Sequence, residues 1–425
     1  MVATLKQNTN AIFSGFFFFM VLFSLFVMRP FRSAIAAQIG TEDLTKWLLL
    51  VVLVMLIANF IYSAAVSRIK ESRLVGYIYG FFIINLLIFA YINFKYESNY
   101  IVAYINDKYE SNYGLSVTFY IWYNVFNFFV ISIFWAKTVN CFDRSGGNKY
   151  FGIISAFGSA GAFLGSRTSA ALSDAPTTVI AIAFIALIFA ICFSSELNLV
   201  KSKKITKKDI RSDLIEQISQ VKNNPMVQKL LIYAFIWTCC STALYFFSLE
   251  IINNYTNDEE QQRRIFASAD SLVTPIALFL QIFVTKFLLE NRFFGLKFIL
   301  GIYGILFIIS YLMMAGHFAG YLFTGTGVLL FLIISALMRP FEYAINKPAR
   351  ETVYTMLKKK EKYKSTVFID TFINRSGDAS GGLLFNIMLT IGFALSAAPL
   401  AIIPLAAVLT SYGIDISKSV KNAKS

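Results

Sequence analysis

Residues 28–35 read MRPFRSAI, and the pattern returns at residues 338–345 as MRPFEYAI, so that six of the eight positions are identical. Each copy puts an arginine beside a proline at the end of, or inside, a long apolar run. An ionisable group at bilayer depth costs about 2.5–3.5 kcal/mol or more unless it faces water or a partner. Arg29 and Arg339 therefore predict a path for an anion through a membrane. The two copies are either an internal repeat or a chance match in an apolar chain.

The composition of the 425 residues is that of a polytopic membrane protein. Hydrophobic residues make up 57% of the chain and charged residues only 15%, and the mean hydropathy is +0.63. Apolar runs of about 20 residues cross the hydrocarbon core of a bilayer. We therefore predict an all-α membrane protein with twelve transmembrane helices in two six-helix bundles. The expected spans are Ala11–Met28, Trp47–Ser67, Leu74–Phe94, Leu115–Ala136, Tyr150–Leu172, Thr177–Ser195, Lys229–Leu249, Ile265–Leu289, Gly295–Gly316, Tyr321–Ile345, Thr366–Thr390 and Ile391–Thr410.

A polar segment separates the two sets of six spans. We expect residues 1–200 to form the N-terminal bundle, residues 201–228 a cytoplasmic amphipathic linker, and residues 229–425 the C-terminal bundle. The linker begins with a run of lysines and continues with apolar residues at helical spacing. A near-perfect tandem copy at residues 90–113 is expected to be a local duplication in a surface loop, with no role in transport.

The positions of the lysines and arginines predict the orientation. Most of the 38 fall in segments that are cytoplasmic if the N-terminus is inside, and cytoplasmic loops retain such residues. Both termini are therefore expected in the cytoplasm, and the protein in a bacterial cytoplasmic (inner) membrane. Topology accounts for most of the net charge of +14, so no nucleic-acid partner is needed to explain it.

Several classes of function find no support in the sequence. The four cysteines lack zinc-site spacing, and the one histidine, His317, is expected in a short outer turn. No set of residues matches a nucleophile, a metal site or an acid–base pair. We therefore expect neither an enzyme nor a bound cofactor.

If the bundles are built from three-helix repeats, spans one, four, seven and ten line a central cavity. The polar residues of these spans are the candidate substrate contacts, because buried amides and charges need partners. The candidates are Arg29, Arg32, Tyr123, Asn124, Asn127, Lys137, Trp237, Arg339, Glu342, Asn346, Lys347 and Arg350.

Span ten is expected to be bent or interrupted, because Pro340 and Pro348 each remove a backbone donor. The residues expected to share one stripe along it are Arg339, Tyr343, Asn346 and Arg350. Charged residues there and on other spans are candidate gating or coupling groups. They are Asp270, Glu351, Asp370, Arg375 and Asp378, with Arg350–Glu351 and Arg375–Asp378 as expected ion pairs.

Small residues predict close helix contacts in both halves. Gly158, Gly161 and Gly165 repeat along span five, and Gly377 and Gly381 lie on span eleven. The lining residues point to a class of solute. Arginine presents a planar fork of donors that suits phosphate, and aromatic rings offer a face on which a base can stack. A basic, aromatic lining therefore favours a phosphorylated solute that carries a ring.

Several motifs resemble the ATP/ADP translocase family of bacteria and plastids. They are KPARE at 347–351, EKYK at 361–364, FIDT at 368–371 and R-x-G-D at 375–378, with FW at 134–135 before Asn140 and YFG at 150–152 before the glycines of span five. Weaker similarity runs over nearly the whole chain. The motifs around Asp370 look like the branch of the family found in free-living bacteria, whereas residues 29–33 lack the acidic residue of the nucleotide exchangers. The resemblance implies a major-facilitator-like fold.

The resemblance also implies nucleotide exchange by alternating access, ATP against ADP or another triphosphate against a diphosphate. The expected partners are a nucleotide or other phosphorylated anion and the lipid bilayer, and the protein is expected to be a monomer. Two alternatives stay open. One is a proton-coupled symporter of another organic anion, in which Asp270, Glu342, Asp370 or Asp378 titrates. The other is a membrane sensor or scaffold that transports nothing.

Overall fold

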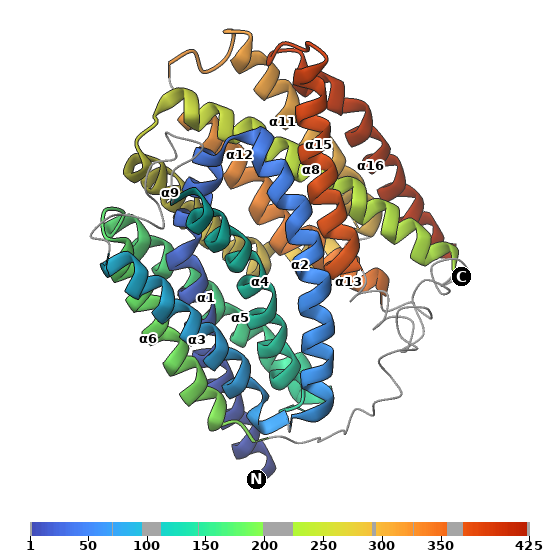
Figure 1. The fold of residues 1–425 in the computed structure, drawn as a ribbon. Coiled ribbons are helices and arrows are strands. Elements are labelled where there is room, and N and C mark those ends of the chain that lie inside the picture. Colours follow the sequence, from blue (N-terminus) through green and yellow to red (C-terminus); the bar gives the residue numbers. More distant parts are fainter. Residues whose placement is uncertain are drawn as a thin grey trace. The chain divides into compact units, whose positions relative to one another are not determined.

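The computed structural model describes residues 2–69, 71–95, 112–142, 144–198, 224–290, 295–325, 327–354 and 369–422, and within these ranges it is built of helices and turns (Figure 1). Three short segments, labelled η, are π-helical turns. The elements are α1 (Val2–Ile39), α2 (Thr41–Arg68), α3 (Glu71–Lys95), α4 (Asn112–Val139), α5 (Arg144–Ala171), α6 (Pro176–Ser195), α8 (Pro225–Tyr255), α9 (Glu259–Phe279), η1 (Leu280–Val284), α10 (Thr285–Glu290), α11 (Gly295–Phe318), α12 (Val328–Phe341), η2 (Glu342–Asn346), α13 (Lys347–Tyr354), η3 (Ile369–Ile373), α15 (Asn374–Thr390) and α16 (Ala398–Asn422).

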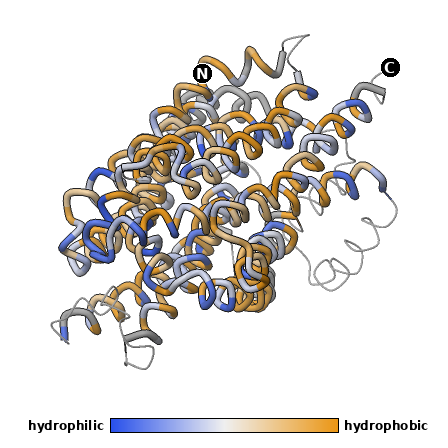
Figure 2. The backbone as a smooth tube through the Cα atoms, turned by 90° about the horizontal axis from the view of Figure 1, so that it is seen from above, coloured by the Kyte–Doolittle hydropathy of each residue, from blue (hydrophilic) through white to orange (hydrophobic). Residues whose placement is uncertain are grey.

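The expected all-α membrane fold is confirmed. Among the described residues, nine helices are long and apolar enough to cross a membrane, and hydrophobic residues colour much of the tube in Figure 2. Large apolar side chains such as Ile61 and Phe283 are 66% and 65% exposed. Such exposure is expected where side chains face acyl chains. The count of twelve spans stays a prediction. Most of the linker (199–223) and most of the tandem copy (96–111) lie outside the described residues.

The ends of several spans differ from those expected. α1 continues through Pro30 to Ile39, and Gly40 then adopts a positive φ of 79°, which favours glycine after the end of a helix. α12 begins only at Val328 and α16 only at Ala398, each seven residues later than predicted. The apolar residues before them form turns, and hydropathy alone does not separate an apolar turn from the helix that follows it.

The contacts divide the chain into two units, and each unit takes residues from both halves of the sequence. Unit 1 comprises Met1–Gln38, Ala58–Thr206 and Thr256–Pro275. Unit 2 comprises Ile39–Ile57, Lys207–Tyr255 and Ile276–Ser425. The first part of α2 therefore belongs to the second unit and the first part of α9 to the first. The expected domain limits at 200 and 229 stay a prediction.

In unit 1, α5 lies against α1 through its glycines. A Cβ atom at Gly161 would collide with the carbonyl oxygen of Phe19, and one at Gly165 would lie 2.7 Å from the carbonyl oxygen of Phe23. The two backbones are thus as close as glycine allows. Small residues let membrane helices gain packing in this way, without a hydrophobic driving force between them.

In unit 2, the same device joins α15 to α8 and α11 to α16. A Cβ atom at Gly381 would collide with the carbonyl oxygen of Cys239, and one at Gly377 with the side chain of Thr238. On α11, Gly304 makes the corresponding close approach to α16, and these two helices run beside each other in Figure 1. The contacts fix α8, which carries part of the candidate site.

Replacing Gly161 by alanine should destabilise the protein by about 1–3 kcal/mol, because the added methyl group forces α5 away from α1. The melting temperature of the detergent-solubilised protein measures this. Gly152→Ala, on the same helix, is the control, since a Cβ atom there meets nothing within 4 Å. Equal melting temperatures for the two variants would contradict the close α1–α5 contact.

Candidate functional site

Arg29 of α1 lies inside the apolar span Asn8–Ile39, about three turns before its end. Its Nε atom lies 3.7 Å from Oδ2 of Asp270 on α9, and the two side chains are 28% and 4% exposed. Asp270 is about 16 Å from the start of its helix at Glu259. A buried carboxylate thus faces an arginine that remains partly accessible.

Arg32, one turn further along α1, is held by an aromatic residue of α4. Its Nη2 atom donates a hydrogen bond of 2.8 Å to the hydroxyl of Tyr120, and its guanidinium lies 4.5 Å from the centroid of the same ring. The neutral phenol positions the guanidinium without cancelling its charge. Polar residues of the first and fourth expected spans therefore come together in unit 1.

In unit 2, η2 and α13 carry a line of polar side chains. Glu342 accepts a hydrogen bond from Arg350 and another, of 2.6 Å, from Nδ2 of Asn346. All three side chains are buried. Arg350 thus pairs with a carboxylate eight residues before it, whereas the sequence pointed to the adjacent Glu351. A buried pair of this kind adds little net stability, but losing one partner is costly.

A π-helical turn explains why the expected stripe is wrong at Tyr343. The helix passes through Pro340 and Pro348 without interruption and widens between them into η2. The wider turn rotates Tyr343 outward, where it is 40% exposed, and brings Glu342 into line with Arg350. Single π turns inside α-helices are frequent at functional sites.

Aromatic residues of α8 and α11 surround this line. The guanidinium of Arg350 lies 4.8 Å from the ring centroid of Trp237. The hydroxyl of Tyr233 lies 2.9 Å from Oδ1 of Asn346 and 3.2 Å from a backbone carbonyl oxygen of α11, and it donates to one of them at a time. Tyr303 of α11 is also buried and stacks on a ring of α12. Residues of the seventh and tenth expected spans are thereby joined in unit 2.

A third charged pair lies on α15. Arg375 donates a hydrogen bond of 3.0 Å to Oδ2 of Asp378, as expected from their spacing. The other oxygen of Asp378 accepts a hydrogen bond of 2.9 Å from Thr242 on α8. Asp378 lies about one turn after the start of α15 at Asn374. The side chain of Asp370 is outside the described residues.

Three of the predicted substrate contacts have structural roles. Lys137 is buried at the end of α4 and donates a hydrogen bond of 2.5 Å to the carbonyl oxygen of Ser194, which ties α4 to α6. Tyr123 is buried and donates to the carbonyl oxygen of Leu25, joining α4 to α1. Asn124 donates to a carbonyl oxygen one turn back on its own helix. These contacts stabilise the bundle and do not require a substrate.

The other candidates differ in exposure. Arg339, Asn127 and Glu351 are half-buried on α12, α4 and α13, and Lys347 is exposed at the start of α13.

The predicted set omits three tyrosines that lie among the charged groups. They are Tyr120, Tyr233 and Tyr303. The first two lie one turn from a predicted contact on the same helix, so a signal was present. Aromatic residues are too common in membrane helices for that signal to single them out.

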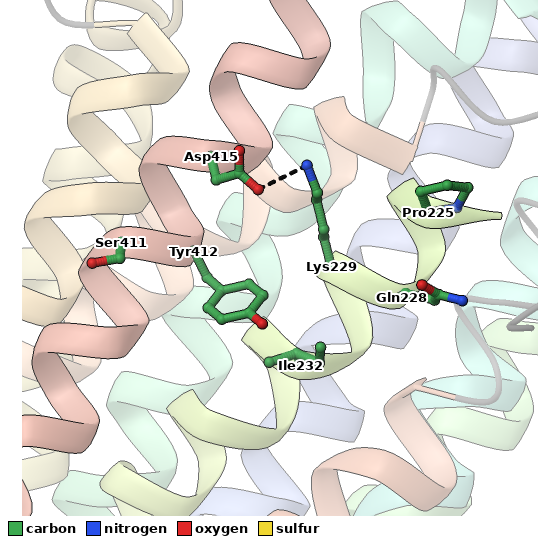
Figure 3. A pocket seen from close by; sticks show the side chains of 7 residues that line it. All are labelled: Pro225, Gln228, Lys229, Ile232, Ser411, Tyr412 and Asp415. Carbon is green, nitrogen blue, oxygen red and sulfur yellow. Dashed lines mark ion pairs between the residues drawn. The ribbon is translucent and has the colours of Figure 1, made fainter.

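A surface groove of about 370 Å³ lies elsewhere in unit 2, between the start of α8 and α16 (Figure 3). Lys229 points across it to Asp415, with Nζ and Oδ2 2.7 Å apart. None of the predicted substrate contacts lines the groove. Within the described ranges, no cluster of histidine, cysteine, aspartate and glutamate side chains could hold a metal ion.

Comparison with solved structures gives the fold family. The nucleoside transporter NupG superposes with a TM-score of 0.60 at 11% identity, covering 97% of this chain and 99% of its own. A POT family transporter gives 0.60 at 12% identity over 94% of each chain. A bacterial homologue of the human lysosomal transporter Spinster gives 0.54 at 11% identity over 98% and 95%. The chain therefore has the fold of major-facilitator transporters.

No protein-family model and no curated protein sequence matches the chain. The resemblance to the ATP/ADP translocases consequently rests on the motifs alone.

Replacing Glu342 by glutamine should destabilise the protein by about 3–5 kcal/mol, because the buried guanidinium of Arg350 then loses the carboxylate with which it pairs. Thermal unfolding of the solubilised protein checks this. The double variant Glu342→Gln/Arg350→Gln should recover much of the loss. Asp415→Asn, which breaks a partly exposed pair, should cost less than about 1 kcal/mol. Strict additivity of the changes at 342 and 350 would exclude the coupling.

Proposed function

We propose that this protein is a membrane transporter of phosphorylated anions, with nucleotides as the substrate class. One observation carries the proposal. Arg29 lies inside the apolar span Asn8–Ile39, partly accessible, and one turn from a second arginine that an aromatic ring holds. Arginines inside a membrane span are expected where a substrate or an ion is handled. The transporter fold supports the same conclusion.

The chemistry of the residues favours a nucleotide over a simple carboxylate. Guanidinium groups bind phosphate oxygens through two parallel hydrogen bonds. Trp237 is half-buried and lies against Arg350, and a base can stack on such a ring. NupG is a nucleoside transporter, and a nucleoside shares its base and sugar with a nucleotide.

The ion pairs indicate how exchange would proceed. Arg29, Arg350 and Arg375 each have a carboxylate partner. A phosphate chain that carries several charges competes with a single carboxylate for the same guanidinium. We propose that an entering nucleotide replaces these carboxylates and that its departure restores them, in an antiport of triphosphate for diphosphate.

The proposed substrate contacts are the predicted residues other than Lys137, Tyr123 and Asn124, whose polar groups already bond to backbone carbonyl oxygens. In unit 1 they are Arg29, Arg32 and Asn127. In unit 2 they are Trp237, Arg339, Glu342, Asn346, Lys347 and Arg350. The proposed gating or coupling residues are Asp270, Glu351, Asp370, Arg375 and Asp378.

Replacing Arg29 or Arg32 by glutamine should raise the KM for ATP about tenfold or more, since a hydrogen bond to a charged group contributes about 1.5–3 kcal/mol. Uptake of labelled ATP into proteoliposomes loaded with ADP measures this. Arg73→Gln is the matched control, because Arg73 is exposed near the start of α3. Absence of uptake with ATP, ADP or any other nucleotide trapped inside would exclude nucleotide exchange.

The same vesicles distinguish antiport from proton-coupled symport. Symport stays an alternative because the spans contain carboxylates such as Asp270 and Glu342. Uptake that follows an imposed pH gradient and needs no internal nucleotide would favour symport. Uptake that requires an internal nucleotide, at a rate that does not depend on the pH gradient, supports antiport.

We also propose that both termini lie in the bacterial cytoplasm, which places the turn at Gly40 on the outer face. In intact cells, a membrane-impermeant thiol reagent should then label Glu42→Cys, because Glu42 is exposed at the start of α2. It should not label Lys418→Cys, since Lys418 is exposed near the end of α16 on the cytoplasmic side. The reverse pattern would invert the topology.

A further inference from the structure

Helix α9 is shared between the two units. Its residues up to Pro275 belong to unit 1, and from Ile276 onward the chain belongs to unit 2. The division falls at a proline inside the helix, and the π turn η1 begins at Leu280, about one turn later. Prolines and π turns are the places where helices bend. We call residues 259–275 the strap.

The strap is fastened to unit 1 near its start. Nε of Arg263 donates a hydrogen bond of 2.5 Å to the carbonyl oxygen of Ser173, and the same guanidinium lies 5.1 Å from the ring centroid of Phe31. Gln38 donates a hydrogen bond of 3.0 Å to Oε1 of Gln262. The groups that hold the strap here belong to the latter part of α1 and to the turn between α5 and α6.

About two turns further along α9, the strap is fastened by charge. Arg29 and Asp270 lie 3.7 Å apart, beyond ordinary hydrogen-bond distance, so their attraction is chiefly electrostatic. Asp270 is buried, whereas more than a quarter of the Arg29 side chain is exposed. The same guanidinium is the proposed contact for a substrate phosphate. One cation therefore serves both the strap and the substrate.

We propose that the Arg29–Asp270 pair is a latch that the substrate opens. In this structure, the pair holds the strap to unit 1. When a nucleotide phosphate takes over Arg29, the attraction between Arg29 and Asp270 is lost and the strap is released. Asp270 is then a positioning residue that makes movement of α9 depend on an occupied site. This inference rests on the proposed function.

Beyond Pro275, the helix is attached to the second cluster of polar residues. Oγ1 of Thr285 donates a hydrogen bond of 2.6 Å to the carbonyl oxygen of Ala344, and Nε2 of Gln281 lies 3.5 Å from a neighbouring carbonyl oxygen. Both acceptors belong to η2, the turn that carries Glu342. A strap that bends at the proline would therefore pull on the turn that holds the Glu342–Arg350 pair.

The release of the strap can be measured with a cysteine at a buried alanine, because this substitution removes none of the polar contacts of the strap. Ala267 lies on the strap between Arg263 and Asp270 and is fully buried. We would place a cysteine there, in a chain whose exposed Cys192 is replaced by serine. Right-side-out vesicles are treated with a membrane-impermeant maleimide, with and without ATP or ADP, and the rate of labelling is measured.

The latch predicts that ATP or ADP raises the labelling rate of Ala267→Cys about fivefold or more, the lower end of ordinary coupling between sites. Adding Asp270→Asn should give a high rate without nucleotide and abolish the response. The neutral double change Arg29→Gln/Asp270→Asn should behave in the same way, and it keeps the test open if the single variant fails to fold. Asp415→Asn, which breaks the Lys229 pair instead, should leave rate and response unchanged.

Two results separate the latch from the proposed function. In the first, the vesicles exchange ATP for ADP, but neither nucleotide changes the labelling rate of Ala267→Cys. This result would overturn the latch and leave the transport assignment intact. Vesicles that exchange no nucleotide would remove the transport assignment and with it the role of the nucleotide. A low labelling rate in both variants that lack the carboxylate of Asp270 would also overturn the latch.

Discussion

A charged side chain inside a bilayer must meet an opposite charge, a polar partner or water, and this constraint organises the polar residues of the protein. Arg29, Arg350 and Arg375 each lie beside a carboxylate, and Arg32 lies against a phenol. Breaking any of these contacts would leave a charge in a poor solvent. Arg29 and Arg32 thereby join α1 to helices far away in the sequence.

The class of the fold could be predicted from composition and apolar runs, because a bilayer imposes the length and the polarity of every span. The motif at residues 28–35 likewise identified an arginine that belongs to a membrane span, although the expected span ended at Met28 and the helix continues to Ile39. Pairing on one helix was predictable only where the helix is regular. Arg375 and Asp378 form an ion pair, as their spacing of three residues predicts. Glu342 and Arg350 come together through a π turn, which no pattern of residue types predicted.

The partners of individual polar side chains on neighbouring helices could not be predicted from the sequence for a related reason. A buried lysine at the end of a span looks the same whether it binds a phosphate or the carbonyl oxygen of a neighbouring helix, and Lys137 does the latter. Likewise, a tyrosine in an aromatic chain does not reveal that its hydroxyl contacts Asn346, as Tyr233 does. The decisive information is the identity of the facing helix, which only the tertiary structure supplies.

The π turns make the two units mechanically unequal. Within the described residues, η1, η2 and η3 all belong to unit 2. A π turn holds a surplus residue, and it can migrate along its helix by exchanging one hydrogen bond for the next. Each step of one residue rotates the side chain concerned by about 100° around the helix axis. A shift of this kind in η1, η2 or η3 would change which groups face a neighbouring helix while the helix axes stay at rest, which a regular α-helical turn does not offer.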